Sequence, residues 1–222
     1  MPVISDLQHK ILEQFGRAVD SRHFYLTGGT ALAHFYLQHR KSEDLDFFTS
    51  AVGLISAFGV GLEHHLTQKG FTVKRQRAFE TFVELHVSKA DEFTLIHVAL
   101  DTPFRFENTR QFDHYPGLNV DSLTDIAANK LLALFGRAAL RDFIDVYYLI
   151  KTEKFSKTQM LDQARKKDPG FDLYWLGVAF ERLKAYQQKD YDLSLVFDPL
   201  KAEELLSFFN QWGKEIASSL SG

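Results

Sequence analysis

The apolar positions of the first twenty residues follow a helical period. They recur three or four residues apart, so they lie on one face of a predicted helix from Ser5 to about Asp20. Ser5 or Asp6 is expected to cap the first turn, because a short polar side chain accepts a hydrogen bond from the free backbone N–H groups there. The apolar stripe consists of Leu7, Ile11, Leu12, Phe15 and Val19.

Between residues 24 and 109, strand-like and helix-like patterns follow one another irregularly. The strand-like runs are short, rich in aromatic and β-branched residues, and bounded by polar turns. Because the turns are close and regular βαβ alternation is lacking, we predict a mixed or antiparallel sheet with helices on one side. The expected strands are 24–26, 45–49, 71–77, 79–88 and 93–100, and the expected helices are 30–38 and 54–68.

The C-terminal half carries only helical periods. Ser122, with Asp125 three positions later, forms a capping-box-like start, and Gly136 is expected to weaken or break the first helix. We therefore predict an α+β protein with an α/β core at 1–115 and a helical C-terminal domain at 116–222. The expected helices are 126–135, 139–150, 168–188 and 199–220.

Composition narrows the class of protein. Of the 222 residues, 45% are hydrophobic and 25% are charged, which is the balance of a soluble globular protein. The absence of Cys excludes disulfides and thiol catalysis. The formal net charge of −3 excludes a bulk polycation, so a nucleic-acid contact would need a local basic patch. We see no apolar leader and no run near the roughly 18 apolar residues of a membrane span, and we expect a cytoplasmic protein.

Two glycines stand between a predicted strand and a predicted helix. Gly28 and Gly29 allow a tight backbone turn and the close approach of a ligand. Free N–H groups at the start of the following helix favour a phosphate, and Thr30 adds a hydroxyl donor. Taken alone, the two glycines are more typical of a plain strand-to-helix turn.

A short acidic motif follows on the next predicted strand. Asp44 and Asp46 are two positions apart, so their carboxylates project from one face while Leu45 points into the core. Two neighbouring carboxylates repel unless a cation lies between them, and hard oxygen ligands suit Mg²⁺. Alone, the motif is more typical of a solvated turn paired with Arg40 or Lys41. The order of glycine turn, helix, loop and Asp-x-Asp strand is more specific.

Two blocks of the sequence resemble the AbiEii/AbiGii-type nucleotidyltransferases of the DNA polymerase β-like superfamily. The first block consists of LTGGTALA at 26–33 and HRKSEDLDFF at 39–48. The second consists of NKLLAL at 129–134, Arg137 and RDFIDVY at 141–147, and PFR at 103–105 lies between the blocks. The rest of the helical C-terminal region carries no motif.

The resemblance implies a fold, a reaction and partners. The fold is a nucleotidyltransferase-type mixed sheet flanked by helices, with the core at 1–115, and a helical C-terminal region. The reaction is Mg²⁺-dependent transfer of an NMP from an NTP to a macromolecular acceptor, either tRNA or protein, with release of pyrophosphate. Family members are bacterial toxins of abortive-infection toxin–antitoxin pairs, so an antitoxin protein is an expected partner.

The first block also implies roles for its residues. By resemblance, Gly28, Gly29 and Thr30 hold the triphosphate, and Asp44 and Asp46 bind the metal ions. Two-metal catalysis of this kind stabilises both the attacking and the leaving oxygens.

The second block implies roles in the helical region. Lys130 neutralises charge on the triphosphate, and Asp142 matches a functional position of the family. Arg40, from the first block, pairs with Asp44 or with a phosphate. On one uninterrupted helix, Lys130, Arg137 and Arg141 would form a basic face that meets a triphosphate or RNA, or else a solvated face with internal pairing.

One strand departs from the superfamily pattern. His97 stands where a third carboxylate is expected, and neutral imidazole is a poorer Mg²⁺ ligand than a carboxylate. His97 is a candidate general base for an acceptor hydroxyl. Alternatively the site binds one metal only, or the fold is catalytically degenerate and binds a nucleotide or partner without turnover. Asp101 lies about 13 Å further along the strand and is not expected to substitute.

The predicted strand 71–77 carries a local cluster of positive charge. Lys74, Arg75 and Arg77 lie close together there. Charge of this kind protects an edge strand from pairing with another chain, or contacts an acceptor nucleic acid. The edge interpretation is the favoured one.

Overall fold

The computed structural model describes residues 2–186, 193, 195–198 and 200–220. The chain divides into two compact units, Met1–Leu123 and Thr124–Gly222. Residues 119–121 run beside the first strand, because Leu26 N donates to Asn119 O at 2.9 Å and Asp121 N donates to Leu26 O at 2.8 Å. The connecting segment therefore packs with the first unit. The domain ranges 1–115 and 116–222 stay a prediction about which parts fold independently.

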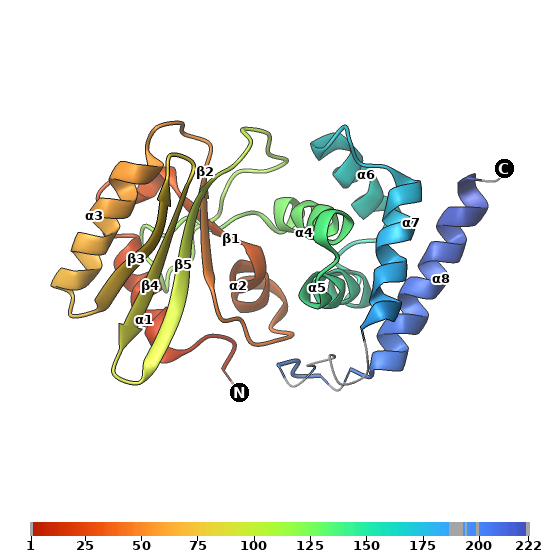
Figure 1. Ribbon diagram of the computed structural model, residues 1–222, viewed down its shortest axis with the longest axis horizontal. Coiled ribbons are helices and arrows are strands. Elements are labelled where there is room, and N and C mark those ends of the chain that lie inside the picture. Colours follow the sequence, from red (N-terminus) through yellow and green to blue (C-terminus); the bar gives the residue numbers. More distant parts are fainter. Residues whose placement is uncertain (1, 187–192, 194, 199, 221–222) are drawn as a thin grey trace. The chain divides into compact units, whose positions relative to one another are not determined.

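The first unit contains a five-stranded mixed sheet (Figure 1). The order is β1-β2-β5-β4-β3, in which β2 and β5 are parallel and the other neighbours antiparallel. This confirms the predicted mixed sheet. The strands are β1 (Tyr25–Thr27), β2 (Leu45–Thr49), β3 (Thr72–Phe79), β4 (Phe82–Lys89) and β5 (Glu92–Leu100).

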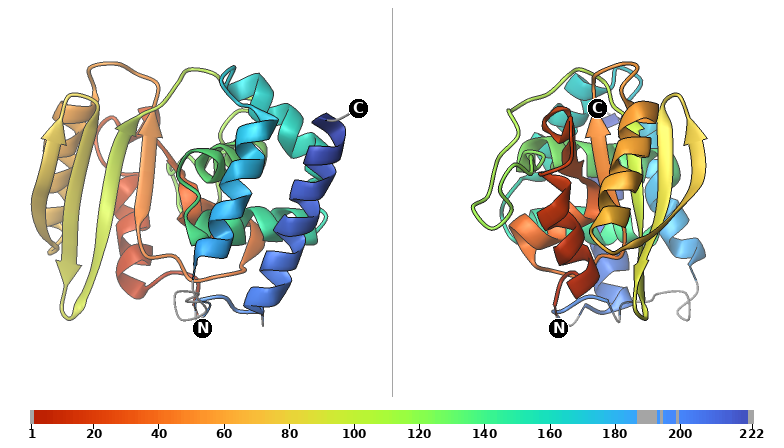
Figure 2. Two further views of the ribbon diagram at one scale, coloured as in Figure 1. Left: turned by 45° about the vertical axis from the view of Figure 1, so that its right-hand side comes forward. Right: turned by 90° about the vertical axis from the view of Figure 1, so that its left-hand side faces the viewer.

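Two helices cover one face of this sheet, as Figure 2 shows: α1 (Asp6–Phe15) packs on β5, and α3 (Ile55–Gln68) packs on β3, β4 and β5. Ser5 caps α1 in a capping box, since Gln8 N donates to Ser5 Oγ at 3.2 Å and Ser5 N donates to Gln8 Oε1 at 2.9 Å. Phe15 stacks on Phe47 of β2 with ring centroids 3.6 Å apart. Aromatic stacking therefore joins this helix layer to the sheet.

The first predicted helix is shorter than expected. It ends at Phe15, and Val19 is 84% exposed. A Cβ at Gly16 would lie 2.5 Å from the carbonyl oxygen of Pro116, so the chain leaves the helix at a point where only glycine allows two backbones to approach.

The turn after β1 leads into a short helical segment. It consists of α2 (Gly28–Leu32), followed by a π-helical stretch, η2 (Ala33–Leu37). A 3₁₀ turn, η1 (Ser21–His23), precedes β1. These pieces place the two glycines at the end of β1 next to β2.

The second unit is helical, as predicted. The chain continues through Gly136 and bends two residues later, at Ala138, which has a φ of 50°. The helix expected to begin at Asp168 is wrong: Asp168 lies at the end of α6, and Asp172 caps α7 by accepting a bond from Trp175 N at 3.1 Å. Part of that expected helix lies outside the described residues. The helices are α4 (Leu123–Arg137), α5 (Leu140–Lys151), α6 (Lys157–Lys167), α7 (Leu173–Glu181), η3 (Arg182–Ala185) and α8 (Ala202–Leu220).

The core of the second unit is aromatic. Trp212 and Phe209 of α8 are each 1% exposed. Phe209 packs edge-on against Phe143 of α5 at 4.9 Å, and Trp212 lies 5.1 Å from the ring of Phe180 on α7. In the part of the chain that is described, we find no helix with the length and apolar character needed to cross a membrane.

Candidate active site

The glycine bend at the end of β1 lies directly against the acidic strand. Gly28 has a φ of +70°, and a Cβ added there would strike the carboxylate of Asp46. A Cβ on Gly29 would lie 2.5 Å from Arg40 Nη2. Glycine is thus required at both positions, because Asp46 lies too close to Gly28, and Arg40 too close to Gly29, for a side chain to fit. The structure therefore brings together the bend, Asp46 and Arg40, three features predicted to share a site.

The loop before β2 is fastened to the turn through Thr30, which is completely buried. Its hydroxyl donates to the backbone carbonyl of Asp44 and shares a 2.8 Å hydrogen bond with the hydroxyl of Ser42. Ser42 N in turn donates to Val3 O at 2.9 Å. What the structure shows for Thr30 is a bond that positions Asp44. The direct phosphate contact stays a prediction.

Asp46 and His97 face each other on parallel strands. They are register partners in β2 and β5, and His97 Nδ1 lies 2.9 Å from Asp46 Oδ1. Because a carboxylate oxygen accepts, Nδ1 is the donor in this bond. Asp46 is also the register partner of Thr27, the residue before the glycine bend. The acid therefore lies between the glycine bend and the imidazole, on one face of the sheet.

Glu84 extends this arrangement on the next strand. It is the register partner of His97, and its Oε2 lies 3.5 Å from His97 Nε2. On the far side, Arg77 Nε lies 3.8 Å from Glu84 Oε1. Sequence reasoning missed Glu84, because a single glutamate on an alternating strand carries no motif. Only the pairing of β4 with β5 brings it to the site.

Carboxylates on both sides act on the imidazole of His97. The hydrogen bond to Asp46 is the largest effect and raises the pKa of His97, while partial burial opposes it. The charges of Asp46, Asp44 and Glu84 raise the pKa further. Asp44 therefore belongs to the same electrostatic cluster as Asp46. Leu45 between them is fully buried, as the strand period predicted.

The donor set fits a hard cation that shares its ligands with a substrate. Among the residues that the structure describes, no three His, Asp or Glu side chains are gathered closely enough to hold a metal ion by themselves. Mg²⁺ is commonly held by one or two carboxylates together with substrate phosphates and water. Asp44 and Asp46 supply such a pair of carboxylates beside the glycine bend.

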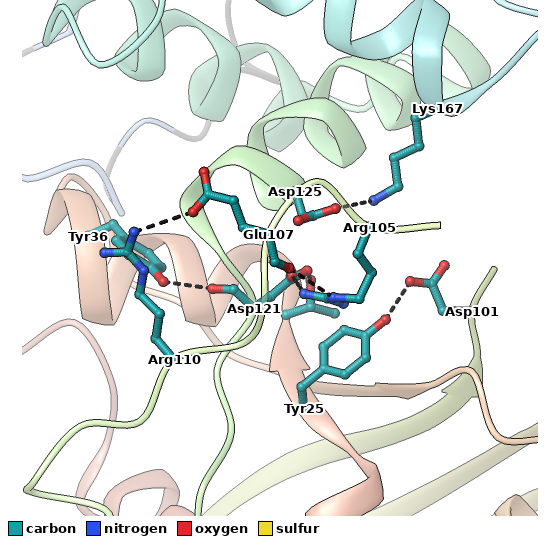
Figure 3. Close-up of polar contacts among 10 residues, drawn as sticks. Tyr25, Tyr36, Asp101, Arg105, Glu107, Arg110, Asp121, Asp125 and Lys167 are labelled. Carbon is teal, nitrogen blue, oxygen red and sulfur yellow. Dashed lines mark hydrogen bonds and ion pairs between the residues drawn. The ribbon is translucent and has the colours of Figure 1, made fainter. Parts of the chain in front are cut away.

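Asp101 is engaged away from this cluster. Its carboxylate accepts a hydrogen bond from the hydroxyl of Tyr25 (Figure 3). Burial and this bond raise the pKa of Tyr25. Asp101 therefore belongs to Tyr25 and not to the acidic pair, as the strand geometry predicted.

A second unpredicted residue anchors the end of β1. Asp121 is fully buried, and its Oδ2 accepts a 2.7 Å bond from the hydroxyl of Thr27. Its other oxygen pairs with Arg105, whose guanidinium lies 4.2 Å above the ring of Tyr25 (Figure 3). Tyr36 donates to the carbonyl of Asp121 at 2.7 Å. Arg105 thus holds Asp121, and Asp121 holds Thr27, the residue before Gly28.

The second block forms a buried ionic network in the other unit. Lys130 is 6% exposed, and its Nζ lies 2.7 Å from Asp145 Oδ2 and 3.7 Å from Asp142 Oδ1. Arg137 grips Asp142 with two bonds, Nε to Oδ2 at 2.7 Å and Nη2 to Oδ1 at 2.8 Å. Because the chain bends after Arg137, Arg141 lies on another helix, and the single basic face we considered does not form. Asp145 belongs to the second block, but its pairing with Lys130 was not predicted from the sequence.

Comparisons with known proteins identify the family of this chain. The chain matches the family described as "Nucleotidyl transferase AbiEii toxin, Type IV TA system" over residues 10–218. A relative from Aquifex aeolicus (strain VF5), the uncharacterized protein aq_aa25, is 26% identical over 149 residues, which cover 67% of this chain and 68% of the relative.

Solved structures share the fold. A putative nucleotidyltransferase from H. pylori superimposes with a TM-score of 0.63 at 19% identity, covering 97% of this chain and 93% of that one. MenT4, nucleotidyltransferase toxin Rv2826c from Mycobacterium tuberculosis H37Rv, superimposes with a TM-score of 0.58 at 16% identity, covering 96% and 90%. At these identities the likeness establishes the nucleotidyltransferase fold alone. Because the family match spans nearly the whole chain, this protein belongs to the AbiEii nucleotidyl transferase toxin family.

Proposed function

We propose that this protein is a Mg²⁺-dependent nucleotidyltransferase that moves an NMP from an NTP to a macromolecular acceptor, either tRNA or protein. Membership of the AbiEii family supports nucleotidyl transfer in general. The metal, the NTP donor and the class of acceptor go beyond that membership.

The approach of Gly28 to Asp46 carries the proposal. A substituent on Gly28 would occupy the place of the Asp46 carboxylate, so the backbone of the bend lies directly beside a carboxylate oxygen. A triphosphate needs both: N–H donors that approach its oxygens closely, and a cation that offsets its charge. A plain strand-to-helix turn needs neither.

The residues of the first unit then take these roles. Asp44 and Asp46 hold Mg²⁺, which when bound offsets the negative charge of the triphosphate. The backbone at Gly28 and Gly29 binds the phosphate oxygens, and Arg40, beside Gly29, adds positive charge. Thr30 contributes by holding the Asp44 carbonyl.

The geometry around His97 favours a positioning role over a general base. Nδ1 faces Asp46 and Nε2 faces Glu84, so each ring nitrogen points toward a carboxylate oxygen that can only accept. A base needs a free lone pair aimed at the acceptor hydroxyl. We propose that His97 instead orients Asp46 for the metal.

In the second unit, Lys130 is proposed to neutralise triphosphate charge, as the family pattern implies. Asp142 and Asp145 fix the position of its ammonium group. Asp142 therefore acts on the substrate only through Lys130.

The direct test is a transfer assay. The purified chain is incubated with each labelled NTP, Mg²⁺ and either total RNA or total protein, and label in macromolecules is measured. Wild type should label one class of acceptor, and Asp46→Asn should lose at least about 100-fold of the rate. RNase or protease treatment of the product identifies the acceptor. No labelling with any NTP, while a control enzyme works, would reject the proposal.

A second candidate rests on His97 in place of the expected carboxylate. In this alternative the fold binds a nucleotide or a partner without turnover. Calorimetry that detects NTP binding, combined with no pyrophosphate release, would favour it over catalysis.

We further propose that the protein acts as the toxin of a toxin–antitoxin pair in the bacterial cytoplasm. Induced expression of wild type should arrest growth, whereas the Asp44→Ala and Asp46→Ala variants should not. Growth should recover when a small neighbouring antitoxin gene is expressed with it. Normal growth despite confirmed expression of active enzyme would exclude the toxin role.

A further inference from the structure

The outer strands of the sheet have two unlike faces. On β4, Val83, Leu85 and Val87 are buried, and the residues that alternate with them keep partial exposure. The edge strand β3 is exposed along most of its length. Since α3 packs on these strands, the buried residues mark the helix-covered face, and their neighbours point to the opposite, open face.

Strand register assigns six aromatic and cationic residues to that open face. Phe79 is opposite Phe82, and Lys74 is opposite His86. Phe93 stacks on His86 with ring centroids 5.4 Å apart. Arg77 is opposite Glu84, which points to the same face. We call this set the aromatic–cationic face: Lys74, Arg77, Phe79, Phe82, His86 and Phe93.

Edge protection explains only part of this composition. Positive charge on β3 discourages pairing with another chain, and β3 is indeed the edge strand. However, Phe79 is 62% exposed and Phe93 is 69% exposed. Exposed phenylalanine beside an open edge adds to the risk of association instead of reducing it. These rings therefore call for another explanation.

The aromatic–cationic face is continuous with the candidate active site. The ring of Phe82 lies 5.7 Å from the ring of His97. Across the same face, register leads from Arg77 to Glu84, His97 and then Asp46. A bound polymer that lies over these rings could therefore place one of its ends beside the carboxylates of Asp44 and Asp46.

We propose that the aromatic–cationic face is the surface on which the unpaired nucleotides of an RNA acceptor bind. This inference rests on the proposed function, because it assigns a binding surface to the acceptor of that reaction. Bases stack on exposed aromatic rings regardless of sequence, and Lys or Arg beside them contacts the backbone phosphates. RNA commonly presents unpaired ends, whereas duplex DNA keeps its bases stacked. A local basic patch is also what a chain of net charge −3 needs for such binding.

Binding can be measured without any transfer. The full chain is titrated into a fluorescently labelled, unstructured RNA oligonucleotide and followed by anisotropy. Phe79→Ala/Phe93→Ala should bind at least about tenfold more weakly, because each stacking ring is lost. Phe79→Tyr/Phe93→Tyr keeps the rings and should stay within about threefold of wild type. The matched control is Val19→Ala/Val60→Ala, which removes exposed apolar residues elsewhere and should leave affinity unchanged.

Salt dependence tests the cations separately. Lys74→Gln/Arg77→Gln should lower the slope of log affinity against log salt by about 1.4, or about 0.7 for each lost phosphate contact on a single strand. Arg75→Gln is the matched control. Arg75 is opposite the buried Leu85, and its Nε lies 3.2 Å from Glu63 on α3, so its slope should equal that of wild type.

Several results would overturn the inference. The first is equal RNA affinity of wild type and Phe79→Ala/Phe93→Ala. The second is tighter binding of duplex RNA or of single-stranded DNA than of the RNA oligonucleotide. The third is a labelled transfer product that resists RNase. The two proposals fail separately. RNA binding that depends on the rings but without NMP transfer rejects the proposed function alone. Transfer to RNA with an unchanged acceptor KM in Phe79→Ala/Phe93→Ala rejects only the aromatic–cationic face.

Discussion

Gly28 and Asp46 lie so close that the carboxylate occupies the place of the side chain that Gly28 lacks. The contact joins two strands that are antiparallel neighbours, because Thr27 and Asp46 are register partners. The glycine is therefore part of the acidic site, and its replacement should affect chemistry as well as folding.

Gly28→Ala should lose at least about 100-fold in kcat/KM of NMP transfer, because the new methyl group displaces Asp46. Its positive φ should also cost about 1 kcal/mol of unfolding free energy. Gly53→Ala is the control, since Gly53 has a φ of +83° with nothing within 4 Å of its added Cβ. It should show the same stability loss, measured by urea unfolding, with full activity. Equal activity of both variants would contradict the idea.

Thr30→Val should destabilise the protein by about 1–3 kcal/mol, because it leaves the Asp44 carbonyl and the Ser42 hydroxyl without their buried bond. Activity should fall as well, since the loop that carries Asp44 loses its attachment. Thr30→Ser keeps the hydroxyl and should retain most of both properties. Thr67→Val removes an exposed hydroxyl bond on α3 and should change neither. Unfolding and transfer rates are compared for all three variants.

Local patterns predicted the elements whose partners lie nearby in the chain. The strand expected at 45–49 is observed as Leu45–Thr49, and its side chains alternate between buried and partly exposed. The helix expected to reach Asp20 ends at Phe15 instead. Gly16 follows it, and there the backbone of Pro116, a hundred positions away in the sequence, approaches closely. Periodicity holds no information about such an approach.

The candidate site divides in the same way. Gly28, Gly29, Asp44 and Asp46 were identified from one continuous stretch and a resemblance. Glu84 and Asp121 were not, since each reaches the site only through the pairing of distant segments. Strand register, and not residue type, decides that Glu84 faces His97.

His97→Asp should make the stability of the folded protein depend on a bound cation. The change places a third carboxylate beside Asp44 and Asp46 and removes the hydrogen bond to Asp46. Like charges repel, so the variant should lose about 1–2 kcal/mol of stability in EDTA. Mg²⁺ should restore it, because a cation that binds only the folded state stabilises that state. Thermal unfolding with and without Mg²⁺ measures this, and a gain no larger than that of wild type would argue against metal binding at these acids.

Lys130→Met should destabilise the second unit by about 3–5 kcal/mol. The variant leaves Asp142 and Asp145 buried with their charge only partly balanced. Adding Asp145→Asn to Lys130→Met should restore part of the loss, because it removes one of the two buried charges. Lys154→Met, at an exposed position, is the control and should change the unfolding free energy by less than about 0.5 kcal/mol. A loss in Lys130→Met as small as in this control would show that the ionic network does not hold the fold.

Acid should weaken the first unit through His34. Burial is the main cause that lowers the pKa of His34 from 6.5 to about 4, and the nearby charges of His9 and His114 lower it further. His34 Nε2 also lies 3.0 Å from the hydroxyl of Tyr115.

The pKa of His34 is lower in the folded protein than in the unfolded chain. Between these two pKa values the unfolded chain therefore binds a proton at His34 that the folded protein does not bind. The stabilisation is therefore complete above pH 6.5 and is lost as the pH falls toward about 4. With partial solvent screening we expect a loss of about 1–2 kcal/mol from this residue. Urea unfolding at pH 7 and pH 4.5 should show a smaller acid loss in His34→Gln than in wild type. His64→Gln, on the exposed side of α3, should lose as much as wild type does. If His34→Gln loses as much as His64→Gln, the acid sensitivity comes from elsewhere in the chain.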